Sequence, residues 1–316
     1  EKATREGFGE GLVAAGTLDT RVVALCADLT ESVKMDAFKD LFPKRFFEVG
    51  ITEQAMSGVA SGMAAMGYIP FMASYAMFSP GRNWEQIRTT IAYNNQPVKI
   101  VGAHAGVSVG PDGATHQALE DIAIMRMLPN MEVYVPCDAV EARAITEHIA
   151  TTKVPAYMRL TREKSPLMLP EGYVWNKGKA YLMHVARHKH GGEFMHSVGV
   201  IACGPIIYEA LKAARELEKE GIGVTVVNMP QVKPLDGSFL LRFAKDVRAI
   251  VTVEEHQVAG GLGSAVAEFL SEHAPMRVAR VGVEDRFGQS GKMQELYEEY
   301  GLTAKHIAEK IRMVAR

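Results

Sequence analysis

Short continuous apolar runs alternate with helix-like segments along most of the chain, and this rhythm limits the possible folds more than any other feature. In the first half the runs cover residues 22–26, 69–73, 98–101, 132–135 and 156–160. The helix-like segments around them cover residues 6–16, 54–64, 85–93, 120–127 and 139–150. Strands that are apolar on both faces and separated by helices are typical of a parallel sheet covered on both sides. The pattern predicts an α/β fold.

The rhythm stops after residue 165 and starts again near residue 193. Residues 166–192 are rich in proline, glycine and basic side chains, which is the composition of a linker. Further apolar runs then cover residues 198–203, 224–229, 249–253 and 278–283. A chain of 316 residues has room for two domains with a core each. We therefore predict domains at 1–165 and 193–316, each with a mostly parallel sheet flanked by helices.

Composition excludes several classes of partner. Charged residues make up 23% of the chain, hydrophobic residues 47%, and the formal net charge is -2, so nucleic acid is not an expected partner. No apolar run is long enough for a membrane span, and the N-terminus has no apolar signal core. We expect a cytoplasmic protein. Its three cysteines, Cys26, Cys137 and Cys203, lie in or beside apolar runs and are interpreted as reduced core thiols.

Two motifs favour structural over functional interpretations. His184, His188, His190 and His196 have no carboxylate or thiol beside them in sequence, so a solvated linker explains them better than a metal site. The glycine-rich run 260–263 lies between a strand and a helix, where it could hold a phosphate. It lacks the spacing of a nucleotide-binding loop, and close packing is the favoured interpretation.

Glu53 is a carboxylate in an otherwise small and apolar run. Thr52 is placed to cap the helix that follows, which puts Glu53 in the first turn. The helix dipole favours an anion there by about 0.3–1 kcal/mol, so the position alone is explained without chemistry. A catalytic acid is the other interpretation.

A second motif runs from residue 102 to residue 121. It contains the imidazoles of His104 and His116, the carboxylate of Asp112 and four glycines, and it lies between a predicted strand and a predicted helix. A glycine-rich loop lets backbone and side chains come close to a small polar ligand. The sequence therefore predicts a binding site in this loop.

Four motifs together resemble transketolases in order and approximate spacing. They are residues 49–54 (VGITEQ), 110–117 (GPDGATHQ), 159–162 (RLTR), and 253–256 (VEEH) with the glycines of 260–263. The resemblance covers nearly the whole chain but only the pyrimidine-binding and C-terminal domains of that family. The Gly-Asp-Gly metal motif of the diphosphate-binding domain does not occur. The chain resembles the smaller, C-terminal subunit of a split transketolase.

The resemblance implies thiamine diphosphate as cofactor, with Mg²⁺ or another divalent cation held mainly by the partner subunit. Glu53 matches the glutamate that donates a proton to N1′ of the cofactor's aminopyrimidine. Phe78 matches the aromatic residue that stacks on the pyrimidine, with Tyr75 beside it, and Asp28 is also assigned to the cofactor site. The following residues 79–82 depart from many transketolases, and a core position remains the alternative for both aromatic side chains.

The resemblance also implies a sugar-phosphate site. Arg5, Ser32, His104 and Arg162 match the residues that hold the phosphate, for which arginine forks are well suited. Asp112 and His116 match residues that contact the sugar, and His104 and His116 join Glu53 as catalytic candidates. Surface charges are the alternative for each arginine taken singly, and a loop-stabilising hydrogen bond is the alternative for His116.

These assignments predict a subunit that transfers a two-carbon ketol unit from a ketose phosphate to an aldose phosphate, as in the pentose phosphate pathway. Its partner would be an N-terminal diphosphate-binding subunit, in an α2β2 heterotetramer with active sites between subunits. A deoxyxylulose-phosphate synthase is an alternative, although those enzymes tend to have arginine where this chain has His104. A 2-oxoacid dehydrogenase beta subunit, a noncatalytic assembly subunit and a sugar-phosphate-binding module also remain open.

Overall fold

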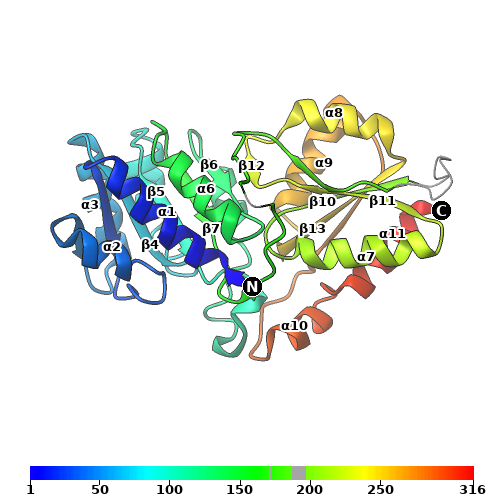
Figure 1. The fold of residues 1–316 in the computed structure, drawn as a ribbon, viewed down its shortest axis with the longest axis horizontal. Coiled ribbons are helices and arrows are strands. Elements are labelled where there is room, and N and C mark those ends of the chain that lie inside the picture. The colour runs from blue at the N-terminus through cyan, green and yellow to red at the C-terminus, as the bar shows by residue number, and fades with distance from the viewer. Residues whose placement is uncertain (171, 187–196) are drawn as a thin grey trace.

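Two lobes lie side by side in the computed structural model, which describes residues 1–170, 172–186 and 197–316 (Figure 1). The first lobe is built around a seven-stranded sheet and the second around a five-stranded sheet. A small two-stranded sheet pairs β1 (Lys2–Ala3) with β8 (Lys164–Ser165), which joins the start of the chain to the end of the first lobe.

The first sheet has the strand order β12-β6-β7-β5-β4-β2-β3. Its six strands from the first lobe are parallel to their neighbours. They are β2 (Val22–Cys26), β3 (Phe46–Glu48), β4 (Ile69–Tyr75), β5 (Lys99–Ala103), β6 (Glu132–Tyr134) and β7 (Ala156–Arg159). The seventh, β12 (Gln231–Lys233), comes from the second half of the sequence and pairs antiparallel with β6. The second lobe thus contributes the edge of the first sheet.

Helices cover both faces of the first sheet, as the apolar strands require. Successive residues of β2 point to opposite faces, so Val22 and Ala24 join one buried cluster while Val23 and Leu25 join another. The first cluster also contains residues of α1, α2 and α6, and the second contains residues of α3, η2 and α5. These elements are α1 (Thr4–Leu18), α2 (Asp36–Leu41), α3 (Glu53–Ala65), η2 (Ile87–Ala92), α5 (Asp121–Arg126) and α6 (Ala139–Ile149).

The second sheet has the order β14-β13-β10-β11-β9, with only β9 antiparallel to its neighbour. Its strands are β9 (Tyr181–His184), β10 (Ser197–Ala202), β11 (Gly223–Asn228), β13 (Ala249–Gln257) and β14 (Val278–Val283). Helices α8 and α9 cover one face, and α7 and α11 cover the other (Figure 1). Their bounds, with the short α10, are α7 (Ile207–Lys219), α8 (Gly237–Asp246), α9 (Leu262–His273), α10 (Met293–Glu299) and α11 (Ala304–Ala315).

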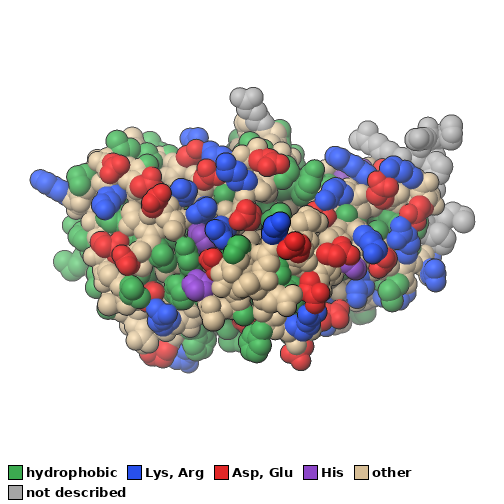
Figure 2. Space-filling model, turned by 90° about the horizontal axis from the view of Figure 1, so that it is seen from below, with side chains coloured by type: hydrophobic (Ala, Val, Ile, Leu, Met, Phe, Trp, Pro, Cys, Tyr) green, Lys and Arg blue, Asp and Glu red, His purple; other side chains and the backbone are tan. Residues whose placement is uncertain are grey.

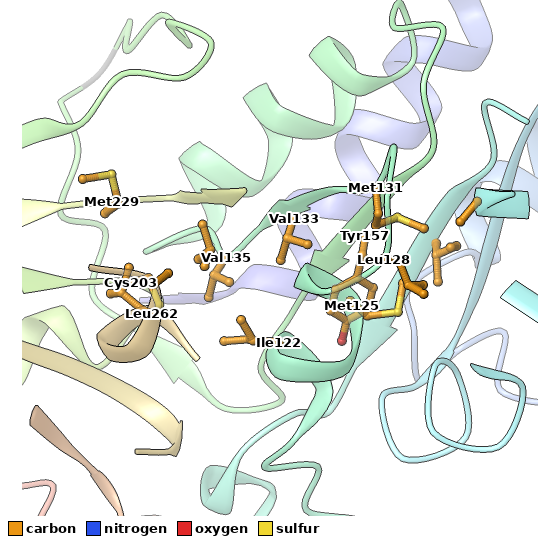
Figure 3. Packing of buried hydrophobic residues seen from close by; sticks show 14 of the residues in the cluster. Ile122, Met125, Leu128, Met131, Val133, Val135, Tyr157, Cys203, Met229 and Leu262 are labelled. Atoms are coloured by element: carbon orange, nitrogen blue, oxygen red, sulfur yellow. The ribbon is translucent and has the colours of Figure 1, made fainter. Parts of the chain in front are cut away.

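One apolar core runs across the boundary between the lobes. Ile122, Val133 and Val135 of the first lobe belong to the same buried cluster as Cys203 and Leu262 of the second (Figure 3). Burial of a large aliphatic side chain contributes about 1.5–3 kcal/mol, so a shared core of this size resists separation of the lobes. The two lobes therefore form one folded unit in this chain.

The predicted α/β architecture with two mostly parallel sheets is confirmed, and several details differ. The predicted helix 85–93 is a short α4 (Trp84–Gln86) followed by the π-helical η2. Thr52 lies at the N-cap of α3, but its hydroxyl donates to the carbonyl of Val49 and does not cap the helix. The predicted capping hydrogen bond was wrong because this hydroxyl closes the preceding turn instead.

The predicted linker contains structure as well. Strand β9 lies within residues 166–192 and pairs with β11, so this part of the linker extends the second sheet. His184 at its end lies 2.9 Å from a carboxylate oxygen of Glu218, a partner that sequence proximity did not indicate. His188, His190 and His196 lie outside the described residues. No helix in the described part of the chain is long and apolar enough to cross a membrane.

Candidate active site

The candidate site residues come together because they follow the carboxyl ends of parallel strands. Asp28 follows β2, Glu53 follows β3, Tyr75 ends β4, His104 follows β5, and Arg162 follows β7. The carboxyl ends of parallel strands lie at one edge of a sheet, where open α/β folds bind their ligands. Five segments that are distant in sequence therefore supply one region of the surface.

Glu53 is buried at the start of α3, with 1% of its surface exposed. Its Oε2 atom accepts a hydrogen bond from Nη1 of Arg82 at 2.9 Å, and the Arg82 side chain is 46% exposed. The charged partner of the buried Glu53 carboxylate is therefore the guanidinium of a side chain that faces solvent. An exposed cation of this kind can be displaced by a ligand at small cost.

A buried amide fixes the backbone beneath Glu53. The Nδ2 atom of Asn83 lies 3.0 Å from the Glu53 carbonyl, 2.9 Å from Ser57 Oγ and 3.1 Å from Ser79 Oγ. Asn83 and Ser57 are fully buried. This network joins the first turn of α3 to the turn that follows Phe78, so the glutamate and the aromatic side chain keep a fixed spacing.

Aromatic side chains form a row beside Glu53. The Phe78 and Tyr75 rings stack with centroids 5.8 Å apart and an interplanar angle of 17°. Tyr75 also stacks on the His104 ring at 3.9 Å, and the Arg82 guanidinium lies 4.7 Å from the Phe78 centroid. Phe78 and Tyr75 are only partly buried. Tyr75 also packs against the apolar core of the first lobe, and both rings keep exposed surface that a ligand could contact.

Two arginines meet near Tyr75 and His104. Arg5 donates through Nη1 to the carbonyl of Ser32 at 2.7 Å and through Nε to the carbonyl of Arg162 at 3.3 Å. Burial, with the nearby positive charge of Arg162, lowers the pKa of Arg5. Arg5 thus contacts the Arg162 backbone, and the two positive charges are near enough to affect each other and to favour an anion beside them. The structure thus brings together three members of the predicted phosphate set, although Ser32 contacts Arg5 through its backbone.

His104 is the fourth member of that set. It is 2% exposed, has a positive φ of 52°, and its Nδ1 atom is buried without a hydrogen-bond partner in the described residues. Burial, and then the charges of Arg5, Arg162 and His116, lower the pKa of His104 to about 3. The imidazole is therefore neutral near pH 7, with one nitrogen that can donate and one that can accept a hydrogen bond.

Asp112 and His116 lie farther along the same loop. Asp112 Oδ1 is 3.7 Å from Nη1 of Arg162, and both side chains are about one-third exposed. The edge of the His116 ring approaches Phe78 at a centroid distance of 5.4 Å. Its Nδ1 atom lies 2.9 Å from Thr115 Oγ1, so a local hydrogen bond does exist at this histidine. His116 therefore lies beside the aromatic row, and Asp112 lies beside Arg162.

Asp28 follows β2, which lies between β4 and β3 in the sheet, and it has a positive φ of 60°. Its backbone N–H donates to Oε1 of Glu48 at 2.7 Å, and Oε1 also accepts from the N–H of Gly50 at 3.1 Å. Thr30 donates to the other oxygen of Glu48 at 3.0 Å. Glu48 thus ties the turn after β2 to the turn that leads into Glu53.

Comparisons with known proteins identify the class. The transketolase pyrimidine-binding domain matches residues 1–167, and the transketolase C-terminal domain matches residues 193–307. The chain belongs to the transketolase family and carries the pyrimidine side of a transketolase-type site.

Particular relatives sharpen this placement. The chain is 40% identical to a putative transketolase C-terminal section of Methanocaldococcus jannaschii, over 98% of this chain and 95% of that protein. It is also 40% identical to a 6-deoxy-6-sulfo-D-fructose transketolase subunit of a Clostridium species, over 96% of this chain and 91% of that one. A solved structure described as a split-gene transketolase, an inactive β4 tetramer, superimposes with a TM-score of 0.91 at 42% identity, covering 100% of this chain and 99% of that chain.

A pyrimidine-binding domain of this family implies thiamine diphosphate, and the residues present fit its pyrimidine. Arg82 presents a planar, nitrogen-rich cation that pairs with the Glu53 carboxylate and lies against the Phe78 ring. An aminopyrimidine offers the same combination of a flat face and nitrogen donors. Within the described ranges, no group of three or more His, Cys, Asp or Glu side chains is arranged to hold a metal ion.

Three parts of the site were not predicted from the sequence: Arg82, Asn83 and Glu48. Arg82 and Asn83 are about thirty residues from Glu53 in sequence, and their contacts with it depend on the turn after Phe78. Residues 79–82 depart from many transketolases, and that departure was the available signal.

Figure 2 shows acidic and basic side chains interspersed over one face of the molecule, so this face has no extended area of a single charge.

Proposed function

We propose that this chain is the pyrimidine-side subunit of a thiamine-diphosphate-dependent transketolase, which moves a two-carbon ketol unit from a ketose phosphate to an aldose phosphate. The observation that supports this most strongly is the position of Glu53. A buried carboxylate and an aromatic face lie together at the carboxyl edge of the sheet, and Arg5 and Arg162 lie near the His104 end of the same aromatic row. One end suits a pyrimidine and the other an anionic sugar.

Each site residue of this chain would have a role that follows from its chemistry. When bound, thiamine diphosphate would supply the nucleophilic carbon that takes up the ketol unit. Glu53 would hold a proton at N1′ of the pyrimidine, and the Phe78 face would exclude water from the ring, a contact worth on the order of 1 kcal/mol. Asp28 follows β2 beside the same edge and would border the cofactor.

The substrate would lie along the other end of the row. Arg5 and Arg162, with Ser32 beside them, would hold the anionic tail through charge-assisted hydrogen bonds. His104, neutral near pH 7, would donate a hydrogen bond to a sugar oxygen or accept one from a sugar hydroxyl. Asp112 would accept from a hydroxyl, and His116 would face the reacting end. This division accounts for the roles predicted from the sequence.

The outer face of α3 supports a partner at the cofactor end. Ile51, Val59 and Met66 on and beside this helix are 69%, 43% and 81% exposed, and Gly58 and Gly62 have open space next to them. Exposed apolar area of this kind marks interaction surfaces. We assign it to a separate diphosphate-binding subunit, which would also hold Mg²⁺ or another divalent cation. The inactive β4 assembly of a relative is consistent with a chain that needs a partner, and an α2β2 complex is the expected active form.

The test is reconstitution. The chain is mixed with its diphosphate-binding subunit, thiamine diphosphate and Mg²⁺, and ketol transfer from a ketose phosphate to an aldose phosphate is followed. We expect transfer only from the mixture. Activity with pyruvate as donor would favour a deoxyxylulose-phosphate synthase or a 2-oxoacid dehydrogenase component instead, and no activity with either donor would favour a noncatalytic subunit.

A further inference from the structure

Residues 255–257 at the end of β13 each form a hydrogen bond with the first lobe. The Glu255 carbonyl accepts from Nη2 of Arg159 at 2.7 Å, and the His256 Nε2 atom accepts from the N–H of Ala123 at 3.3 Å. The N–H of Gln257 donates to the carbonyl of Leu119 at 2.9 Å. The sequence motif around Glu255, which the proposed function leaves without a role, therefore connects the second lobe to the segment that follows His116.

The Glu255 carboxylate reaches the substrate loop itself, residues 104–119. It is 3% exposed, and its Oε1 atom accepts from the N–H of Ser108 at 2.6 Å. Its other oxygen accepts from the Tyr297 hydroxyl, at 3.0 Å. Buried charged groups are costly unless both oxygens are satisfied, and here one partner lies in each lobe. Glu255 therefore connects α10 of the second lobe to the loop of the first.

Glycines in the loop follow the surface of the second lobe. Gly106 has a φ of 89°, and a Cβ atom there would collide with the Glu255 carboxylate. Gly113 has a φ of 75°, and a Cβ atom there would lie 2.6 Å from Ser290 Oγ. Positive φ and close approach each favour glycine, and both occur at these positions. The loop is shaped by contact with the second lobe and not only by its own turns.

The side-chain amide of Gln117 contacts backbone carbonyls within the substrate loop and in the second lobe. Its Nε2 atom lies 3.1 Å from the Val107 carbonyl, 3.2 Å from the Gly110 carbonyl and 3.0 Å from the Gln289 carbonyl. The first two contacts hold the loop together, and the third holds it to the second lobe. Gln117 follows His116 directly, so any shift of this amide moves that histidine.

These contacts fix the residues assigned to the substrate. His104 precedes Gly106 by two positions, Asp112 precedes Gly113, and Arg162 donates to the Val109 carbonyl of the same loop at 2.7 Å. A loop held at both ends and from the second lobe presents its side chains with little ordering cost on binding.

We propose that Glu255 is a positioning residue for sugar-phosphate recognition, and that the second lobe serves as the template on which the substrate loop is held. The inference rests on the proposed function, because it assigns a purpose to the loop that would contact the sugar. Glu255 itself touches neither substrate nor cofactor in this account.

The test compares Glu255→Ala with a matched change at the lobe boundary. Asn228→Ala removes a buried contact between the lobes, in which Asn228 Nδ2 lies 2.9 Å from Glu141 Oε1, away from the loop. Hydrogen exchange of residues 104–119 and steady-state kinetics are measured on the assembled enzyme. In Glu255→Ala we expect exchange of the loop amides to rise and KM for the sugar phosphates to rise about tenfold, with kcat changed less than about twofold. Asn228→Ala should change neither.

Conservative variants separate positioning from general stability. Glu255→Gln keeps an acceptor for the Ser108 N–H and an amide that can donate to the Tyr297 hydroxyl, so it should restore a near-normal KM. Tyr297→Phe removes one of the two contacts and should give an intermediate KM. If Glu255→Ala lowers thermal stability but changes neither loop exchange nor KM beyond the Asn228→Ala control, the proposal is wrong.

The two failures can be told apart. If the wild-type complex shows no ketol transfer at all, the proposed function fails, while loop exchange still reports whether Glu255 holds the loop. If transfer is normal but the loop exchanges equally in Glu255→Ala and in wild type, only the positioning role fails.

Discussion

The two ends of the candidate site are built differently. At the substrate end, His104 is buried, Arg5 and Arg162 contact backbone carbonyls, and the second lobe holds the loop in between. At the cofactor end, Glu53 is buried too, but its charged partner is the half-exposed Arg82, and the adjacent face of α3 is apolar and exposed. One end is supported within this chain, and the other opens toward solvent.

This difference indicates where the chain is complete and where it needs a partner. A binding surface that is held by contacts with the rest of the chain loses little conformational entropy on binding. A carboxylate held by an exposed arginine is ready to exchange that arginine for another nitrogen-rich group. We therefore expect strong effects of single substitutions at both ends. They should affect turnover and cofactor affinity at the cofactor end, and KM for the sugar phosphate at the substrate end.

The largest effect is expected from Glu53→Gln in the assembled enzyme. Loss of the proton-holding acid should lower kcat by about 10²- to 10⁴-fold, because proton transfer by a positioned side chain contributes about that much. Far-UV circular dichroism and thermal unfolding should stay near wild type. Glu85→Gln, at an exposed acid in the next helix, is the control and should keep full activity. Near-normal turnover in Glu53→Gln would remove the catalytic assignment.

Arg162→Gln should act at the substrate end. Loss of a charge-assisted hydrogen bond costs about 1.5–3 kcal/mol, so KM for the sugar phosphates should rise about 10- to 100-fold while cofactor affinity is unchanged. Steady-state kinetics with phosphorylated and unphosphorylated sugars measures this. Arg88→Gln, at an exposed arginine of η2, is the control. An equal loss with unphosphorylated substrates would show that Arg162 does not serve the phosphate.

Arg82→Gln should have a smaller effect, at the cofactor end, and this effect should be a gain in cofactor affinity. If Arg82 must leave Glu53 and Phe78 for the pyrimidine to bind, then its removal eliminates a competing ion pair and cation–π contact worth about 1 kcal/mol together. Calorimetry on the assembled enzyme should show thiamine diphosphate binding about 3- to 10-fold more tightly. Weaker binding would mean that Arg82 supports the bound cofactor and does not compete with it.

Glu141→Gln should leave the site unaffected and change the stability and its pH dependence. Burial raises the pKa of Glu141 from 4.5 to about 7, so the folded state binds this proton more tightly than the unfolded state. Glu141 should therefore contribute stability that falls as pH rises from 4.5 to about 7, by at most about 1.4 kcal/mol per pH unit. His104, whose pKa is lowered to about 3, contributes with the opposite sign over much of this range. The thermal unfolding midpoint of the wild type minus that of Glu141→Gln should therefore fall from pH 4.5 to about 7. A difference that rises or stays constant over that range would contradict this.

Parts of this structure could be predicted from the sequence because local composition decides them. The run at 22–26 is apolar at every position, as a strand buried on both faces must be, and the run at 98–101 is apolar except for Lys99; both strands were found. Strand β12 was missed because its three residues form a strand only where the edge of the other lobe's sheet is beside them. Strand β9 was missed because its composition is that of a linker and its pairing with β11 is distant in sequence.

The candidate site also has parts that the sequence could predict and parts that it could not. Residue types in the loop at 102–121 indicated a ligand, and the family resemblance proposed a role for each residue. Neither could show that Arg82 pairs with Glu53 or that Glu255 reaches Ser108, because these contacts join segments about thirty and almost 150 residues apart. The roles of the site residues stay predictions until the variants are measured.

Cofactor binding by the chain alone and by the complex tests the central claim most directly. Calorimetry with thiamine diphosphate and Mg²⁺ is carried out on the isolated chain, on the diphosphate-binding subunit, and on their mixture. We predict weak or undetectable binding to the isolated chain and tight binding, with ketol transfer, in the mixture. Tight magnesium-dependent binding to the isolated chain, or a mixture that binds no better than the diphosphate-binding subunit alone, would contradict the account of Glu53 as part of half an active site.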